Sequence, residues 1–557
     1  MTSTSNSEIL SAAIGLMFQD ELTDPAELER LYAPRSLPDG AMVTRVGPSP
    51  TGFMHIGTLY VGLLSERFAH QTKGVFFLRI EDTDKKREVD GATDFISRAF
   101  QHFNIRFDEG RNLDGSENGH YGPYMQSHRA SIYQAFIRHL IQIGKAYPCF
   151  CTPEELDDIR TRQQAQGAAP GYYGDWAVWR HKPLEEAIEW LRAGKSYVIR
   201  FRSPGDIANK IVVNDLLFGE RIVSENDQDI VIMKSDRLPT YHLAHVVDDH
   251  LMRTTHVIRG DEWLPSLPTH LQLFQSLGWV PPAYAHIAPI NKMDGHSKRK
   301  LSKRKDPEAS VSYFTDLGYL QEALLEYLLN LANSNFEDWR KDNPDLSYTD
   351  FYLSFERLAK SNGPLFDFIK LDNISRDMVA RMSAEAVYSQ LVEWARTFDV
   401  SFAELLEDDS DYAKRVLAIE RGGANARKDI VKWSDVKALI ESFFDSQFSL
   451  TVEQAMALLG DRTSEEIRDI VLDFRATYDE ADSKEEWFGK IKAIATNRGF
   501  AEKAGDFKRN PTAYKGTVAD VAKIFRILLL GQSQTPDLYE VMHAMGQGRV
   551  FSRLSLF

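Results

Sequence analysis

The sequence predicts an α/β protein that opens on a parallel β-sheet and continues as a mostly helical chain. Three observations support this prediction: a strand–corner–helix–strand pattern between residues 42 and 80, an apolar helical stripe from Leu320 to Leu331, and a helical pattern from about Ser383 onward. With 557 residues the chain is long enough for several domains, each with its own core. We detect no internal repeat and no low-complexity segment.

Hydrophobic periodicity defines the first two strands and the helix between them. The β-branched segment Met42–Val46 predicts a short strand. Apolar residues from Ile56 to Phe68 recur at helical spacing, and Gly74 lies where that helix would end. The apolar run Val75–Ile80 predicts the second strand. This order is typical of a βαβ unit with two parallel strands.

The corner between this strand and helix has the sequence Pro48-Ser49-Pro50-Thr51-Gly52-Phe53-Met54-His55-Ile56-Gly57. It joins the carboxyl end of a strand to the amino end of a helix, where free N–H groups and the helix dipole favour an anion. The corner is therefore a candidate phosphate site; the alternative is a plain turn that His55 caps. It is neither a Walker A loop nor a Gly-x-Gly-x-x-Gly fingerprint.

A second candidate anchor is a basic run from Lys292 to Lys305, which holds seven Lys/Arg residues against the single acid Asp294. It contains Lys300-Leu301-Ser302-Lys303-Arg304. Considered alone, such a run is usually a solvated loop or a nucleic-acid patch. Together with the corner it is much more specific.

His-Ile-Gly on a strand-to-helix corner, followed far downstream by Lys-Leu-Ser-Lys-Arg, resembles the two signatures of class I aminoacyl-tRNA synthetases. Six further segments are similar to the bacterial-type glutamyl-tRNA synthetase family: Thr44–Gly52, Leu78–Asp84, Gly122–Tyr124, Pro239–Ala244, Val246–His250 and Ile258–Trp263. The resemblance extends from about Arg45 to Leu371. The related glutaminyl enzymes typically have Pro-Glu-Pro-Asn-Gly where this chain has Pro-Ser-Pro-Thr-Gly, which favours glutamate.

The resemblance implies a Rossmann-like catalytic domain interrupted by an α+β acceptor-binding insertion, then mostly α-helical stem-contact and anticodon-binding domains. The expected divisions are an amino-terminal extension (1–41), the catalytic domain (42–120 and 238–292), the acceptor-stem insertion (121–237), the stem-contact domain with the basic loop (293–382) and the helical anticodon-binding region (383–557).

Local patterns within these divisions predict individual elements. Thr23-Asp24-Pro25 offers a helix start, residues 129–144 predict a helix, and residues 197–201 predict a strand. Ser383 is a plausible helix cap.

The implied activity is ATP-dependent attachment of L-glutamate to tRNA-Glu through a glutamyl-adenylate, with release of AMP and pyrophosphate. This reaction needs alignment of the reactants and neutralisation of charge on the phosphates rather than a protein nucleophile. His55 and Lys303 are the expected catalytic residues. The resemblance places ATP against His55, Gly57, Glu262 and Lys303, and suggests that Lys300 and Ser302 shape the loop.

The resemblance also supplies a glutamate site. A buried arginine distinguishes glutamate from glutamine because it pairs with a carboxylate but meets an amide N–H₂ with a clash of donors. Arg45 has that position in the motif; the alternative is an ordinary arginine at a strand end. The other expected contacts are Ser49, Glu81 for the ammonium group, Tyr241, His245 and Arg259. His245 is a departure, because asparagine is more usual there.

Magnesium is expected with ATP, and no protein-bound zinc is expected. Cys149 and Cys151 have only His181 near the place where relatives supply further zinc ligands, and the chain has two cysteines in all. Residues 245–250 contain ligand types, but we expect them at a strand end, where they cannot converge.

Composition favours a cytoplasmic location over a membrane or secreted one, since no apolar run reaches spanning length and two cysteines cannot form a disulfide framework. We also expect the protein to be a monomer. The net charge of −15 argues against a polyanionic partner, but basic residues cluster locally. These clusters lie at 292–305, 421–437 and 503–515.

Several alternatives remain open. One is a synthetase of relaxed specificity that also charges tRNA-Gln, and a less favoured one is a glutaminyl enzyme. A silent RNA-binding paralogue would be expected to lose His55 or Lys303, and an oxidoreductase would need the absent glycine fingerprint. The short paralogue that modifies tRNA lacks the region that this chain has after Lys303.

Overall fold

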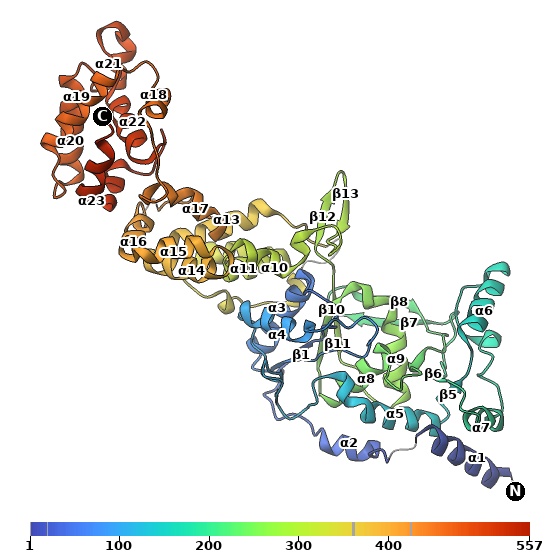
Figure 1. Ribbon diagram of the computed structural model, residues 1–557. Helices are drawn as coiled ribbons and strands as arrows, with labels where there is room; N and C mark the ends of the chain where they lie inside the picture. Colours follow the sequence, from blue (N-terminus) through green and yellow to red (C-terminus); the bar gives the residue numbers. More distant parts are fainter. Residues whose placement is uncertain (1, 19–20, 359–362, 424–425) are drawn as a thin grey trace. The chain divides into compact units, whose positions relative to one another are not determined.

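The computed structural model describes residues 2–18, 21–358, 363–423 and 426–557 (Figure 1). The chain forms two compact units. The first comprises Met1–Tyr313 with Leu325–Asp367, and the second comprises Phe314–Leu324 with Phe368–Phe557. The first unit contains every strand of the described chain and both sequence signatures. The predicted division into five domains stays a prediction.

The predicted βαβ unit is confirmed. Strand β1 (Val43–Val46) pairs in parallel with β2 (Val75–Leu78), with Arg45 opposite Phe77, and α3 (Ile56–Gln71) connects them. Gly74 follows the end of α3 and lies close to the backbone of Met42, which precedes β1. A Cβ on Gly74 would lie 1.9 Å from the carbonyl oxygen of Met42. Only glycine permits this close approach.

The parallel sheet resumes later in the chain, as expected for a Rossmann-like domain. Strand β10 (His256–Gly260) pairs in parallel with β11 (Ala283–Ile287), and α9 (Leu267–Ser276) lies between them in sequence. Thr255 bonds to Val43 at 3.0 Å, which places β10 beside β1. Next to β11 lies the hairpin of β7 (Lys210–Asp215) and β8 (Gly219–Ser224).

The segment between the two halves of the parallel sheet is mixed α and β. Its antiparallel sheet contains β5 (Ala146–Cys149), β6 (Val198–Phe201) and β9 (Val231–Met233). The predicted helix near 129–144 is α5 (Ala130–Gln142). Helices α6 (Pro153–Ala165) and α7 (Leu184–Arg192) complete this region.

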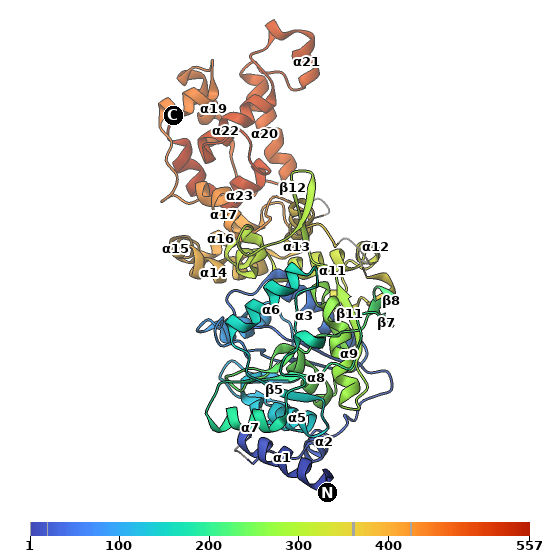
Figure 2. The ribbon, with the colours of Figure 1, turned by 90° about the vertical axis from the view of Figure 1, so that its right-hand side faces the viewer.

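The amino-terminal helices pack on this first unit. Helix α2 (Pro25–Leu31) begins as predicted, with the Asp24 carboxylate accepting a hydrogen bond from Ala26 N at 2.8 Å. Figure 1 and Figure 2 both show α1 (Thr2–Met17) beside α7. Leu28 and Tyr32 lie buried in the same apolar cluster as Tyr133 of α5.

Helix α8 (Tyr241–Leu251) corrects one expectation. Residues 245–250 were expected at a strand end, but they lie inside this helix. The apolar, β-branched run around Val246 and Val247 is too short for periodicity to separate a strand from a buried helix. In a helix, residues four positions apart share a face, so His245 and Asp249 come together.

The basic run forms the hairpin β12 (Asn291–Asp294) and β13 (Ser297–Lys300), and the chain then becomes helical. The apolar stripe near residue 325 lies in α11 (Gln321–Ala332), after α10 (Val311–Leu317) and before α12 (Asn335–Asp342). None of the helices in the described ranges is long and apolar enough to cross a membrane.

The described residues of the second unit form helices joined by turns and coil, with no strand among them. Ser383 caps α14, as predicted, by accepting a hydrogen bond from Ala386 N at 3.2 Å. The helices from residue 368 onward are α13 (Phe368–Arg381), α14 (Ala384–Phe398), α15 (Val400–Asp408), α16 (Ser410–Ala418), α17 (Trp433–Ile440), α18 (Val452–Leu459), α19 (Ser464–Thr477), α20 (Lys484–Asn497), α21 (Ala504–Arg509), α22 (Val518–Leu530) and α23 (Leu538–Leu554). All of them except α21 contribute buried side chains to one apolar core.

Candidate functional site

The two sequence signatures lie against each other, and His55 joins them. His55 caps α3: its Nδ1 accepts a hydrogen bond from Gly57 N at 2.9 Å. Its Nε2 lies 3.2 Å from the carbonyl oxygen of Leu301, so Nε2 carries the donated proton. Burial and the nearby charge of Lys303 lower the pKa of His55, which favours this neutral tautomer.

Lys303 makes the second link between the signatures. Its Nζ donates to the carbonyl oxygen of Phe53 in the corner, although the side chain lies at the surface. Val311 N donates to Met54 O at 3.1 Å just beyond the loop. The structure therefore brings the predicted catalytic pair, His55 and Lys303, to one corner of the fold.

Asp306, a residue with no predicted role, fixes the shape of the basic loop, Lys300–Arg304. Both Nη groups of Arg299 donate to its carboxylate, at 2.6 and 2.8 Å, and Ser302 N donates at 2.9 Å. The hydrogen bonds from Arg299 hold the pKa of Asp306 below its usual range. Glu262 is exposed and lies 3.4 Å from Lys300 Nζ, so the predicted ATP-binding residue Glu262 faces the loop.

Backbone hydrogen bonds attach the rest of the corner to the segment that follows β2. The carbonyl oxygens of Pro48 and Pro50 accept hydrogen bonds from Glu81 N and Val89 N, at 3.0 and 2.9 Å. Gly52 has a φ of +117°, which side-chain-bearing residues rarely adopt. The remaining signature residues fall into two groups: Ile56 and Leu301 are buried, whereas Ser49, Thr51 and Arg304 are exposed.

Arg45 lies in β1 with its side chain almost wholly buried. Its Nε lies 3.2 Å from Asp249 Oδ1. No group in the described part of the chain accepts a hydrogen bond from either Nη of Arg45. The end of this guanidinium is therefore available to a carboxylate. Ser49, the other predicted contact from the corner, is exposed and makes no hydrogen bond to Arg45 within these ranges.

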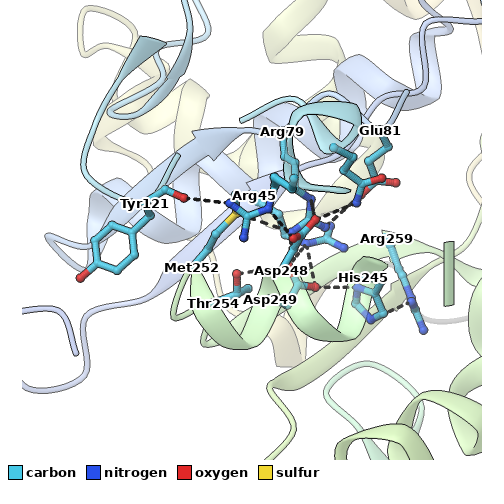
Figure 3. A network of polar contacts seen from close by, with 12 residues as sticks. Arg45, Arg79, Glu81, Tyr121, His245, Asp248, Asp249, Met252, Thr254 and Arg259 are labelled. Carbon is cyan, nitrogen blue, oxygen red and sulfur yellow. Dashed lines mark hydrogen bonds and ion pairs between the residues drawn. The ribbon is translucent and has the colours of Figure 1, made fainter. Parts of the chain in front are cut away.

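Arg45 belongs to a buried charge network (Figure 3). Arg79 donates to Asp249 Oδ1 at 2.7 Å and to Glu81 Oε1 at 2.9 Å, and its Nε lies 3.7 Å from Asp248. Burial raises the pKa of Asp249, but Arg45 and Arg79 outweigh it and hold that pKa well below the usual range. Asp249 thus stays ionised and aligns both arginines.

For Glu81, the effect of burial on the pKa outweighs that of the neighbouring arginines. Burial raises its pKa, although Arg79 and Arg45 oppose this effect. A Cβ on Gly47 would lie 2.2 Å from Glu81 Oε1, so glycine at position 47 makes room for this carboxylate. Arg79 thus holds one oxygen of this buried carboxylate.

Tyr241, His245 and Arg259 meet along the face of α8 that also carries Asp249. His245 Nδ1 lies 2.6 Å from Asp249, and its Nε2 lies 3.0 Å from the Tyr284 hydroxyl. The ring of Tyr241 stacks on that of His245 at 5.5 Å. Arg259 donates to Tyr241 OH at 3.3 Å. The structure thus brings the predicted glutamate contacts on α8 and β10 together.

Arg259 itself is surrounded by histidines. Its Nε donates to His286 Nε2 at 3.0 Å, and the other nitrogen of that ring lies 2.7 Å from Asp215. Its Nη2 lies 3.3 Å from His270 Nδ1. Since a guanidinium only donates, both rings must accept, and burial lowers the pKa of His270 and of His286 accordingly.

The sequence motifs include Asp248, Asp249 and Arg79, but sequence reasoning gave these residues no structural role. A signal was present: two adjacent acids inside an apolar helix can be buried only with basic partners. That signal does not say which of the chain's arginines are the partners.

The cysteines do not form a metal centre with other ligands in the described ranges. Cys149 and Cys151 lie 3.4 and 3.5 Å from the hydroxyl of Tyr172. No group of three His, Cys, Asp or Glu side chains that could hold a metal ion is found among these residues.

Comparisons with known proteins agree with this geometry. The family model for the catalytic domain of tRNA synthetases class I (E and Q) matches residues 41–339. A glutamate–tRNA ligase of Clostridium perfringens is 47% identical over 94% of this chain and 96% of that protein. One from Sorangium cellulosum is 44% identical over 96% of this chain and 97% of its own.

A solved structure is similar over most of its length. It is a glutamate tRNA ligase from Elizabethkingia meningosepticum in complex with its amino acid, with a TM-score of 0.75 and 27% sequence identity. The similarity covers 92% of this chain and 98% of that one.

Buried histidines make stability depend on pH, and His245 allows a direct test. Burial lowers its pKa to about 3, whereas an unfolded histidine titrates near about 6.5. At pH values between these two pKa values, the unfolded state binds more protons than the folded state does. The folded protein is therefore most stable above this pH range, and its stability falls as the pH is lowered through the range. We expect His245→Asn to flatten the rise of unfolding free energy with pH by up to about 1.4 kcal/mol per pH unit.

Urea unfolding at several pH values within that window measures this slope. His120 is exposed and provides a matched control, since His120→Asn should leave the slope unchanged. Equal slopes for the wild type and His245→Asn would contradict a neutral, buried His245.

Proposed function

The chain belongs to the class I tRNA synthetases for glutamate and glutamine, and we propose that it attaches L-glutamate to tRNA-Glu in an ATP-dependent reaction. The reaction passes through glutamyl-adenylate and releases AMP and pyrophosphate. The choice of glutamate rests on Arg45. Its guanidinium is buried, and its two Nη groups donate hydrogen bonds to no described residue. Relatives named glutamate–tRNA ligase over nearly the whole chain support the same choice.

The site favours glutamate over glutamine for an electrostatic reason. Arg45 can give two parallel N–H bonds to a side-chain carboxylate, whereas an amide presents donors to it. Arg45 cannot deprotonate, and Asp249 keeps its Nε engaged. Glutamine would leave a buried positive charge without its partner, which is costly. A glutaminyl enzyme is accordingly not favoured.

The remaining substrate contacts follow from the same network. Glu81 receives the ammonium group, with Arg79 holding its Oε1 in place. Tyr241, His245 and Arg259 form a second group of contacts along α8 and β10, and a contact from Ser49 remains a proposal.

Activation needs the glutamate α-carboxylate to attack the α-phosphate of ATP. His55 and Gly57 at the start of α3 present a helix amino terminus to the phosphates, and the dipole there favours their charge. Lys303 releases Phe53 O and brings its charge to the leaving pyrophosphate. Lys300 and Glu262 lie beside this path.

Magnesium enters as part of the substrate, MgATP, with no dedicated cage supplied by the chain. The two-cysteine pair with Tyr172 lacks the four ligands of a structural zinc site, so we propose that zinc is not required. The cytoplasmic location, the monomeric state and any use of tRNA-Gln remain predictions.

Aminoacylation tests the proposed function directly. Purified protein should charge tRNA-Glu with glutamate in the presence of MgATP and should not charge any tRNA with glutamine. The four combinations of glutamate or glutamine with tRNA-Glu or tRNA-Gln should be measured separately. Charging with glutamine alone would contradict the proposal, and glutamate on tRNA-Gln would establish relaxed specificity.

Arg45→Gln should lower kcat/KM for glutamate by about 10³-fold or more, because a site built around a carboxylate loses its charged partner. The KM for ATP should change little. Pyrophosphate exchange measures both, and Arg98→Gln is the control, since Arg98 is exposed on α4 (Ala92–His102). Near-normal use of glutamate by Arg45→Gln would disprove the assigned role.

Lys303→Ala should lower the single-turnover rate of glutamyl-adenylate formation by roughly 10²–10³-fold while tRNA affinity is kept. Lys298 and Lys305 are exposed on the same loop and serve as the comparison. Replacing both by alanine should instead weaken tRNA binding and flatten its salt dependence by about one unit of slope for each lysine that neutralises a phosphate. Normal activation by Lys303→Ala would reduce the loop to a binding patch.

A further inference from the structure

The amino-terminal segment has no role in the proposed function, yet it is bonded to the helix that aligns Arg45. Residues 21–40 precede the matched catalytic domain, which begins at residue 41. In this segment Glu29 of α2 lies 2.6 Å from His250 Nε2 and 2.9 Å from Arg253 Nη2. His250 is the next-to-last residue of α8. The segment therefore holds the carboxyl end of α8.

Further bonds reinforce this attachment. Arg253 has a φ of +59°, an uncommon conformation outside glycine, and its Nε donates to Tyr32 O at 2.8 Å. Arg35 donates to Met252 O at 3.0 Å, and its two Nη groups pair with Glu109 at 2.8 Å each. A strained residue at the end of α8 is thus retained by contacts with residues 29–35.

A second path leads from the same segment into the buried charges. The Tyr32 hydroxyl donates to Gly122 O at 2.7 Å and accepts from Arg129 Nη1 at 3.1 Å. Arg129 is fully buried, and its Nε donates to Asp248 at 2.7 Å. Its Nη2 has no hydrogen-bond partner within the described ranges. The placement of this arginine therefore depends on what Nη1 and Nε touch.

The position of Arg129 determines whether Arg79 bonds mainly to Asp249 or to Asp248. With Arg129 on Asp248, Arg79 gives its short bond to Asp249 and keeps only a 3.7 Å approach to Asp248. If Arg129 withdrew, Asp248 would be a buried carboxylate short of positive charge and would attract Arg79. Asp249, which aligns Arg45, would lose the shorter of its two arginine contacts, the one with Arg79.

We propose that Tyr32 is a positioning residue for glutamate recognition: its hydroxyl fixes Arg129 on Asp248 and so preserves the Asp249–Arg45 alignment. This inference rests on the proposed function, in which Arg45 binds the glutamate side chain. It gives the amino-terminal segment a part in amino-acid binding, although none of the described residues of that segment hydrogen-bonds to Arg45.

The test removes one hydroxyl at a time. Tyr32→Phe should raise the KM for glutamate about three- to tenfold, because Arg129 then lacks one hydrogen bond while Tyr121 O and Pro123 O still accept from it. The KM for ATP should stay within about twofold. Tyr121→Phe is the matched control: its hydroxyl anchors the same segment, donating to Ala33 O at 2.8 Å, without touching Arg129.

Both tyrosine variants should fold, and their melting temperatures should be compared. If Tyr32→Phe does not fold, Glu29→Ala tests the path through the end of α8, with the exposed Glu27→Ala as its control. Glu29→Ala should also raise the KM for glutamate and not that for ATP.

The outcomes separate the two proposals. An unchanged KM for glutamate in Tyr32→Phe, or an equal rise in Tyr121→Phe, overturns the inference while wild-type activity upholds the proposed function. An equal rise in the KM values for both substrates shows a general structural effect and also overturns it. A wild-type protein that does not activate glutamate overturns the proposed function and this inference together.

Discussion

The burial of two adjacent carboxylates, Asp248 and Asp249, in α8 is the constraint on which the rest of the site depends. Each is fully excluded from solvent, so each needs positive partners from elsewhere in the fold. Arg129 serves Asp248, whereas Arg45 and Arg79 serve Asp249. Removing one partner of such a buried pair typically costs about 3–5 kcal/mol. The charges therefore lock α8, β1, the segment after β2 and the start of α5 together.

In the proposed function, this network serves recognition as well as stability. Asp249 engages Arg45 through Nε only, so the flat end of the guanidinium remains open to a ligand. Because its charge partner is already in place, Arg45 does not have to be ordered when substrate binds, and that lowers the cost of binding. His245 connects Asp249 to the surroundings of Arg259. There a neutral histidine, His286, accepts a hydrogen bond from Arg259.

The corner and the basic loop, where we propose that the phosphates bind, are built differently. His55 bonds to the backbone of Leu301, and Lys303 bonds to the backbone of Phe53, so residues that are at least partly exposed bridge the corner and the loop. These contacts involve carbonyl oxygens and a long, flexible side chain rather than buried ion pairs. The loop keeps its own shape through Asp306 and Arg299. The proposed amino-acid site, built on buried ion pairs, thus lies in the same unit as the proposed phosphate site, built on contacts to backbone oxygens.

The sequence by itself determined the βαβ unit, the Asp24 and Ser383 helix starts and the two signatures, because periodicity and turn chemistry act over a few neighbouring residues. It misplaced residues 245–250, since a short apolar run suits a strand or a buried helix equally. Only the tertiary structure decided which charges meet. Arg45 and Asp249 are 204 positions apart, and Tyr32 and Arg129 are 97 apart. Such pairings depend on how distant segments pack, which no local pattern specifies.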